Sequence, residues 1–324
     1  MSLYDAIAGL ELQIDGVELE RREVSVTTGF QRVTTTVVLE GAGARGSGED
    51  VIYSAEQHDD YPQLRERGRK TLDELSAELE AYGFEDYRRW AFESAALDLA
   101  LVQNGTSLGG ALGLEYRSVR FVVSTRAEVK PWLALYPELE LKLDPTSDWS
   151  TELMHELAST GRVRVLDLKG QYHGTAVDQA PDPVLYGAVV ETFPDVIVED
   201  PALTPETRAV LAAAKERLSW DAPIHSVADI ERLEWEPRHL NIKPSRFGSV
   251  RNLLDAIDYC RARGIAMYGG GQFELGPGRG HVQRLASLFY AEAPNDVAPG
   301  VYNEGGPRPG LPQSPLPVVV PNGL

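Results

Sequence analysis

Four short apolar runs in the middle of the chain each end in a residue that can do metal or acid–base chemistry. Helix-length segments separate these runs, so we interpret them as consecutive strands of a parallel sheet. In a closed parallel barrel the carboxyl ends of the strands open into one mouth, which is where such barrels do chemistry. The residues that end the four runs are Asp167, Glu199, Asp221 and Lys243.

Three carboxylates at neighbouring strand ends indicate a site for a hard divalent cation. A single acid after a strand is usually a helix cap or a surface charge. Three that share one mouth would repel each other unless a cation compensates them. The donor set contains only oxygen, which favours Mg²⁺, with Mn²⁺ as the alternative. By the two-residue strand period, Asp195 and Asp200 are expected to point away from this site.

Lys243 ends the fourth run and shares a face of its strand with Asn241. A lysine beside a metal ion is a candidate general base. The alternative interpretation is a lysine that simply reaches from a strand end into solvent.

The chain before residue 119 has a different pattern from the chain after it. Residues 9–40 alternate like an antiparallel meander, and residues 41–62 show no clear period, which is typical of a disordered segment or a functional loop. Two helices follow, the first opened by a capping box from Thr71 to Glu74. From Val119 onward strands and helices alternate, which indicates repeated βα units that close into a barrel. The predicted strands are 120–124, 139–143, 162–168, 196–199, 218–221, 239–243 and 266–268.

We therefore predict an α/β protein with three parts. Residues 1–118 form an α+β domain, residues 119–293 form the barrel, and residues 294–324 form a Pro/Gly-rich tail that wraps the surface and partly joins the first domain.

Bulk properties exclude several classes of protein. The net charge of −18 argues against binding to nucleic acid, which requires Lys and Arg to neutralise phosphates. No apolar run approaches the ~18 residues of a membrane span, and no signal peptide is evident. The single cysteine, Cys260, cannot form an internal disulfide, which fits a cytoplasmic protein. Homo-oligomerisation stays open.

The ordered set of motifs resembles the enolase superfamily, in particular its muconate-lactonizing and o-succinylbenzoate-synthase-like branch. Glu199-Asp200-Pro201, Trp220-Asp221 and 242–248 look like its fourth, fifth and sixth strand motifs, and residues 91–100 look like the helix joining its capping domain to its barrel. The resemblance covers essentially the whole chain. It implies a (β/α)₇β barrel with an α+β capping domain, one Mg²⁺, and removal of a proton α to a substrate carboxylate.

The second and third strands depart from that family's pattern. Where the family has Lys-x-Lys, this chain has Glu140-Leu141-Lys142-Leu143-Asp144, so Lys142 is either the second lysine or the first, with Asp144 in the second position. Where the family has Asp-x-Asn, the chain has Asp167-Leu168-Lys169. We predict Lys142 as the second catalytic lysine, with Lys169 as the alternative. Lys169 could instead only pair with Asp167 or Asp144.

Further residues are predicted to contact the substrate. Three glycines after the seventh strand would let the backbone approach a ligand closely, although a bulged strand end is the structural alternative. The resemblance also places loops around residues 30–32 and 43–62 over the substrate, where a lid would exclude water. The predicted substrate contacts are Gly270, Gly271, Gln272, Glu274, Asn241, Phe30 and Arg32.

The resulting hypothesis is an Mg²⁺-dependent lyase or isomerase of a small carboxylate, acting through an enediolate by syn-dehydration, cycloisomerisation, or racemisation or epimerisation. Two alternatives remain. One is a non-catalytic metal-binding barrel that has lost part of its lysine pair. The other is a metal-free aldolase that forms a Schiff base on Lys243.

Overall fold

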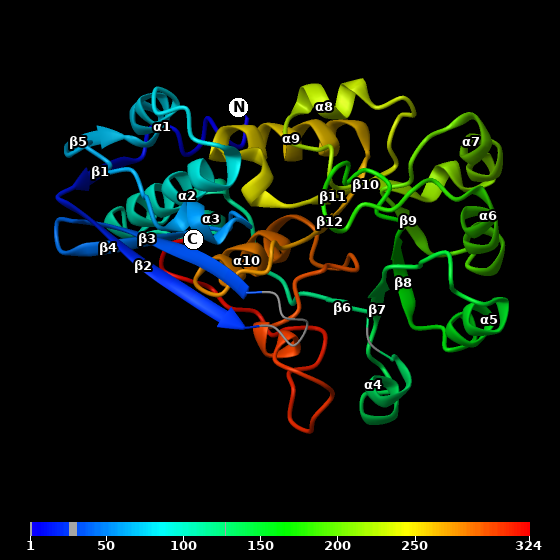
Figure 1. Cartoon of the computed structure of the whole chain (residues 1–324). Helices are drawn as coiled ribbons and strands as arrows, with labels where there is room; N and C mark the ends of the chain where they lie inside the picture. Colours follow the sequence, from blue (N-terminus) through cyan, green and yellow to red (C-terminus); the bar gives the residue numbers. More distant parts are fainter. Residues whose placement is uncertain (1, 26–30, 127) are drawn as a thin grey trace.

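Seven short parallel strands, adjacent in chain order, form the main sheet of the protein (Figure 1). The computed structural model describes residues 2–25, 31–126 and 128–324. Each of the seven strands overlaps one predicted strand, so the predicted α/β class is confirmed. They are β6 (Val123–Thr125), β7 (Leu141–Leu143), β8 (Val163–Asp167), β9 (Ile197–Glu199), β10 (Leu218–Trp220), β11 (His239–Ile242) and β12 (Ala266–Gly269).

Asn295 and Asp296 bridge the two edges of this sheet. Parallel bridges pair Asn295 with Phe121, just before β6, and Asp296 with Gly270, just after β12. The N–H of Asp296 donates to the carbonyl of Gly269 at 2.7 Å. Asn295 and Asp296 therefore take the position of a short eighth strand in the barrel wall. The wall thus includes residues that the sequence assigns to the tail, which was predicted to begin at residue 294.

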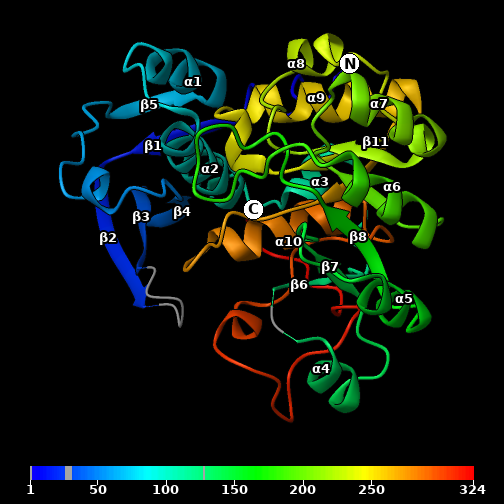
Figure 2. The same cartoon turned by 45° about the vertical axis from the view of Figure 1, so that its right-hand side comes forward.

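A helix follows each of the seven strands and packs on the outside of the barrel (Figure 2). Local signals in the sequence set their ends. Thr204 caps the helix that begins at Pro205, and Gly264 ends another in the left-handed conformation, at φ +67°. The helices are α4 (Lys130–Leu135), α5 (Thr151–Ser159), α6 (Pro183–Thr192), α7 (Pro205–Leu211), α8 (Val227–Arg232), α9 (Val250–Arg263) and α10 (Gly278–Phe289).

The N-terminal domain packs a long helix, α2 (Asp86–Gln103), against a three-stranded antiparallel sheet. The sheet contains β2 (Gly16–Ser25), β3 (Gln31–Gly41) and β4 (Ala44–Asp50). The sequence places β4 in a segment without regular structure, and that interpretation is wrong. A β-carbon on Gly46 would lie 2.1 Å from the backbone nitrogen of Leu99, so the glycines that hide the strand pattern are what let the strand touch the helix.

The first predicted strand of the meander has a different partner. β1 (Glu11–Ile14) pairs with β5 (Gly68–Thr71) in a separate two-stranded sheet rather than with β2. The capping box at Thr71 then opens α1 (Leu72–Glu80), as predicted, and α3 (Leu108–Leu112) leads into the barrel. Within the described residues, no helix is long and apolar enough to cross a membrane.

The N-terminal domain touches the barrel on one side of its mouth. Helix α2 packs against residues 244–247, the turn after β11, and against α9 (Figure 1). The barrel-mouth side of β10 and β11 is therefore the side that the N-terminal domain covers.

Candidate metal and proton-transfer site

Three carboxylates from neighbouring strands meet at the barrel mouth. Asp167 is the last residue of β8, Glu199 is the last of β9, and Asp221 directly follows β10. All three side chains are fully buried, and one oxygen from each lies within 4.8 Å of the others. An all-oxygen cluster of this size can hold a hard divalent cation.

The carboxylates at the mouth outnumber the cations when the neighbours of the cluster are included. The acids are Asp144, Asp167, Glu199, Asp200, Asp221 and Asp296, and the cations are Lys142, Lys169, Lys243 and Arg246. Burial raises the pKa of Glu199 well above its usual range despite the nearby ammonium of Lys142. Burial likewise raises the pKa of Asp200, to about 7, with repulsion from Asp221 adding to it. In Asp167 and Asp221 burial acts in the same direction, but neighbouring cations outweigh it and the net pKa is lowered. A divalent cation would remove the excess of negative charge.

Asp200 is not a member of the three-carboxylate cluster, as expected, but it positions the neighbouring ligand. Its backbone has φ +48°, which breaks the two-residue strand period after Glu199. The carboxylate then accepts the N–H of Asp221 at 2.8 Å and the N–H of Ala222 at 2.9 Å. Asp200 thus fixes the backbone that carries Asp221.

Lys243 lies on the β11 side of the cluster. Its Nζ is 2.7 Å from Oδ2 of Asp221, and Arg246 donates to the other oxygen of Asp221 at 2.7 Å. The side chain of Lys243 passes close to Gly270. A β-carbon on Gly270 would lie 2.8 Å from Cε of Lys243. A side chain at residue 270 would therefore displace Lys243.

Lys142 lies among carboxylates and is almost fully buried. Its Nζ is 2.5 Å from Glu199, 3.4 Å from Asp167 and 3.6 Å from Asp296, in the position of the eighth strand. Burial lowers the pKa of Lys142, but the attraction of these carboxylates outweighs it and the net pKa is raised well above the ordinary value. Lys142 is therefore a fixed positive charge.

Lys169 lies next to Lys142 on the same side. Its backbone has φ +54°, unusual for a lysine, and the chain curls so that the ammonium pairs with Asp167 and lies 3.7 Å from Asp144. Burial lowers its pKa, but Asp167 and Asp144 outweigh this and the pKa is raised. In the alignment that makes Lys142 the first lysine of the motif, Asp144 takes the place of the second, and Lys169 brings an ammonium close to that place.

Asn241 and Tyr268 hold Glu199 in place. The amide nitrogen of Asn241 donates to both carboxylate oxygens at 3.3 Å, and the hydroxyl of Tyr268 donates to one of them at 2.5 Å. The structure therefore brings Asn241 to a candidate metal ligand.

In the glycine-rich loop after β12, groups predicted to contact a substrate instead contact other parts of the protein. The N–H of Gly270 donates to the carbonyl of Ile242 at 3.1 Å, so this amide is not available to a substrate carboxylate. A β-carbon on Gly271 would lie 2.5 Å from Glu274, whose carboxylate is 2.9 Å from Arg279. Gly271 and Glu274 therefore serve the shape of the loop.

Gln272 lies over the site. Its amide oxygen accepts from Nε of Arg246 at 2.9 Å and from Tyr87, and its NH₂ group donates to Tyr53 at 3.0 Å. Tyr53 and Tyr87 belong to the N-terminal domain, so Gln272 links that domain to the side of the mouth that carries Lys243 and Arg246.

Arg32 connects the N-terminal domain to the loop after β12 in the barrel. Its side chain is fully buried, and it donates to the carbonyls of Val51, Ile52, Gln272 and Phe273. Four of the five N–H groups of its guanidinium are thereby used. The predicted contact of Arg32 with a substrate thus gives way to a structural role, and Phe30 lies outside the described residues.

Three residues at the mouth were not singled out from the sequence. Arg246 lies within the motif at residues 242–248. It could have been found from the sequence, because it follows Lys243 by only three residues. Asp296 lies in a segment predicted as tail, and Tyr172 lies in the loop between β8 and α6 with no recognisable pattern around it. Only the folded chain brings them to the carboxylates.

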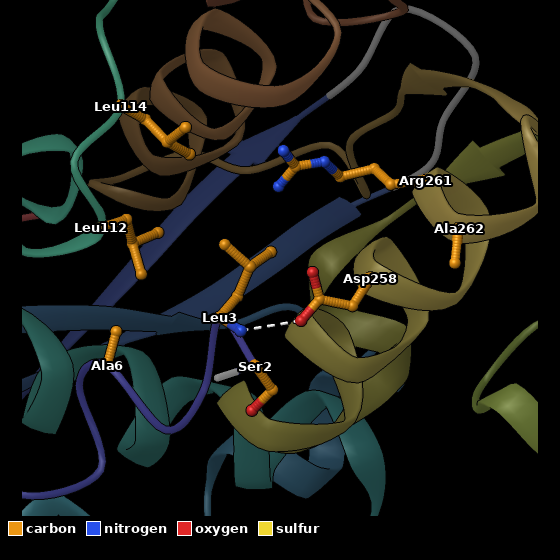
Figure 3. A pocket seen from close by; sticks show the side chains of 8 residues that line it. All are labelled: Ser2, Leu3, Ala6, Leu112, Leu114, Asp258, Arg261 and Ala262. Carbon is orange, nitrogen blue, oxygen red and sulfur yellow. Dashed lines mark hydrogen bonds between the residues drawn. The ribbon is translucent and has the colours of Figure 1, made fainter.

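A separate surface cleft of about 600 Å³ lies between the N-terminal segment, α9 and the end of α3 (Figure 3). Asp258 there accepts the N–H of Leu3 at 2.7 Å. The cleft shares no residue with the barrel mouth and has no cluster of converging polar groups. We therefore place the chemistry at the carboxylates rather than in the cleft. Its lining residues are Ser2, Leu3, Ala6, Leu112, Leu114, Asp258, Arg261 and Ala262.

Solved structures share this fold at low sequence identity. A dipeptide epimerase from Methylococcus capsulatus, complexed with Mg ion, aligns with a TM-score of 0.72 at 19% identity, over 88% of this chain and 90% of that one. A muconate cycloisomerase from Pseudomonas fluorescens aligns with a TM-score of 0.68 at 15% identity, over 89% and 87% of the two chains.

One curated relative is an o-succinylbenzoate synthase from Listeria innocua serovar 6a. It is 33% identical over 86 residues, which is 26% of this chain and 23% of that protein. The match thus spans less than a quarter of the relative's length.

The fold is that of the enolase superfamily, as the motifs predict. Its neighbours include muconate-lactonizing and o-succinylbenzoate-synthase-like members, and also an epimerase, which the motifs did not predict. Residues 5–111 match the N-terminal domain and residues 115–304 the C-terminal domain of DUF8230, described as a domain of unknown function. The chain belongs to the DUF8230 family.

Proposed function

We propose that this protein is an Mg²⁺-dependent lyase or isomerase that removes the proton α to the carboxylate of a small substrate. The observation that carries the proposal is the juxtaposition of a buried three-carboxylate cluster with Lys243, which contacts one member of that cluster at 2.7 Å. The Mg ion in the Methylococcus capsulatus epimerase structure supports the choice of metal.

The donor set of this chain fits the metal. Asp167, Glu199 and Asp221 offer only oxygen and are buried. With Asp144, Asp200 and Asp296 beside them, the acids of the mouth outnumber its cations. When bound, Mg²⁺ would act as a Lewis acid that stabilises negative charge on the substrate carboxylate. Asp200, Asn241 and Tyr268 would orient these three ligands through the hydrogen bonds described above.

The use of lysine in this chain supports a proton-transfer role. Of its 31 basic residues only six are lysines, at positions 70, 130, 142, 169, 215 and 243. Three of the six lie in the barrel mouth. Arginine keeps its proton under all ordinary conditions, whereas lysine can release one, so lysine is the cation that acid–base chemistry requires.

Lys243 is the residue that we assign as the base. It would take the α-proton, and the electron pair of the broken C–H bond would move toward the carboxylate to give an enediolate. Lys142 and Lys169 would stabilise that charge as fixed ammonium groups. The carboxylates around them favour their protonated forms. Syn-dehydration or cycloisomerisation needs only Lys243 to act, whereas racemisation needs a competent acid on each face, which Lys142 or Lys169 would have to supply opposite Lys243.

The test combines metal binding with proton exchange. Titration calorimetry should detect Mg²⁺ binding by the wild type and its loss in Glu199→Gln. In D₂O with Mg²⁺, ¹H NMR across a library of small carboxylates should show exchange of an α-proton. Lys243→Ala should slow that exchange by about 10²–10⁴-fold and leave Mg²⁺ binding intact.

Two outcomes would contradict the proposal. Exchange that continues unchanged in Lys243→Ala would remove Lys243 from the mechanism. Tight Mg²⁺ binding without any exchange would favour the non-catalytic metal-binding barrel, which is the second candidate because Asp144 replaces the motif's second lysine if Lys142 is the first.

A further inference from the structure

Tyr172 brings a neutral hydroxyl group into the candidate reaction centre. Its hydroxyl donates to Oδ2 of Asp221 at 2.7 Å. The Nζ of Lys243 lies 2.7 Å from the same oxygen atom. Two atoms that each lie 2.7 Å from a third are at most 2.7 + 2.7 = 5.4 Å apart. The hydroxyl is thus close enough to the assigned base to touch a molecule on which that base acts.

Cations surround the ring of Tyr172. The Nζ of Lys169 is 4.9 Å and the Cζ of Arg246 is 5.7 Å from the ring centroid. Arg246 also donates to the hydroxyl of Tyr172 at 3.3 Å. These contacts place Tyr172 between the Lys169 and Lys243 sides of the mouth, with its hydroxyl directed to the candidate metal ligand.

The backbone holds Tyr172 at this place. The N–H of Gly170 donates to the carbonyl of Asp200 at 2.9 Å, and the side chain of Gln171 donates to the carbonyl of Pro201 at 2.6 Å. On the other side, Thr175 donates to the carbonyl of Tyr172 through both its N–H, at 3.0 Å, and its hydroxyl, at 2.8 Å. A residue anchored on both sides is preorganised for contact rather than free to swing away.

We infer that Tyr172 is a substrate-contacting residue, whose hydroxyl turns its single proton from Asp221 to an oxygen of the substrate beside Lys243 when a metal ion takes that carboxylate. The inference rests on the proposed function, which puts the substrate carboxylate at this mouth. A phenol suits the role because it donates a hydrogen bond without adding charge to a site already lined by four cations, Lys142, Lys169, Lys243 and Arg246.

The competing explanation is structural: the hydroxyl would only hold Asp221 in place. The two explanations differ in what Tyr172→Phe changes. The variant keeps the ring and its cation contacts but loses the donor. Tyr186→Phe is the matched control, because Tyr186 is a buried tyrosine of the same region whose hydroxyl accepts from the N–H of Ala202 at 3.2 Å, away from Asp221.

The experiment uses two probes on the full-length chain. Electron paramagnetic resonance measures the affinity for Mn²⁺, and titration of the Mn²⁺-loaded protein measures the affinity for malonate, a small dicarboxylate. We expect Tyr172→Phe to bind Mn²⁺ within about threefold of the wild type but malonate about tenfold more weakly, because it loses a hydrogen bond to a charged group. Tyr186→Phe should change neither affinity.

Equal malonate affinity in Tyr172→Phe and the wild type would overturn the inference. A loss of Mn²⁺ affinity as large as the loss of malonate affinity would also overturn it, since the hydroxyl would then act only through Asp221. A wild type that binds Mn²⁺ but not malonate would refute the inference and leave the metal site standing. A wild type that binds no Mn²⁺ would refute the metal site and the inference together.

Discussion

The two sides of the carboxylate cluster hold their lysines in opposite ways. On the side of β10 and β11, one carboxylate, Asp221, is shared by Lys243 and Arg246. On the side of β7 and β8, carboxylates outnumber cations, and two lysines are enclosed by four acids. The residues of this second side are Lys142, Lys169, Asp144, Asp167, Glu199 and Asp296.

The difference indicates how one barrel can use the same side chain for two tasks. A buried lysine among several carboxylates keeps its proton and acts as a fixed charge. Lys243 contacts one carboxylate of the cluster, Asp221, which Arg246 also contacts. Under the proposed function the β7 and β8 side would hold charge and the Lys243 side would transfer the proton, and four substitutions can break or sharpen that distinction.

Lys142→Met should have the largest effect on stability. The substitution leaves Glu199 and Asp167 buried without their shared cation, and the loss of one partner of a buried pair typically costs about 3–5 kcal/mol. Urea unfolding without metal should show this loss, and added Mg²⁺ should restore part of it because ligand binding stabilises the folded state. Lys130→Met, at a lysine whose side chain is 77% exposed, is the control. A Lys142→Met protein as stable as the control would show that Lys142 compensates nothing.

Asp200→Asn should come next and should act on metal affinity. The carboxylate now accepts two backbone N–H groups, whereas an asparagine would turn its own NH₂ group toward one of them. The backbone of Asp221 would shift, and loss of such an orienting partner typically weakens metal binding by about 10–100-fold. Calorimetry with Mg²⁺ measures the change. Asp195→Asn, an exposed neighbour in sequence, should bind Mg²⁺ like the wild type; equal affinities in all three proteins would contradict the role of Asp200.

Lys243→Met should destabilise the protein much less than Lys142→Met. Asp221 keeps the hydrogen bonds from Arg246 and Tyr172 at 2.7 Å, so no carboxylate is left unpaired and the cost should be about 1 kcal/mol. Urea unfolding of both variants under identical conditions makes the comparison direct. If the two losses are equal, the two sides of the cluster do not differ in the way described here.

The barrel could be predicted from the sequence because its elements are defined locally. Apolar runs end in Asp167, Glu199 and Asp221 at regular intervals, and caps such as Thr204 and Gly264 mark the helix ends. Parallel topology then brings the strand ends together without further information. The convergence of the three acids could therefore be predicted from the sequence alone.

The errors have a common physical cause: the deciding contact is distant in sequence or the backbone is unusual. Gly46 and Gly48 hide β4 because their function is close approach to α2, on another segment of the chain. Asp200 has positive φ, so the strand period did not predict that its carboxylate would hold the backbone of Asp221. Tyr172 reaches Asp221 from a loop, which has no periodic pattern from which the position of a side chain could be predicted.

The smallest predicted effect concerns pH and the contact between the N-terminal domain and the β10 side. Nδ1 of His225, which follows β10, lies 2.6 Å from Asp86 at the start of α2. The hydrogen bond that His225 donates to the carboxylate of Asp86 raises the pKa of His225, although burial opposes it. A raised pKa in the folded state means that the pair stabilises the protein below pH ~6.5 and that this contribution is lost as pH rises through the folded-state pKa. Both side chains are nearly half exposed, so the contribution should be under about 1 kcal/mol.

His225→Gln tests this contact, because glutamine keeps a hydrogen-bonding group but does not titrate. The wild type should exceed the variant in unfolding free energy at pH 6, and the difference should shrink by pH 9. High salt should reduce it at pH 6, since the pair is partly exposed to solvent. His173→Gln, whose side chain is 75% exposed, should show no such pH dependence. A difference that grows toward pH 9 would mean that His225 contributes as a neutral side chain, and the β10 side would then lack an ionic link to the N-terminal domain at this contact.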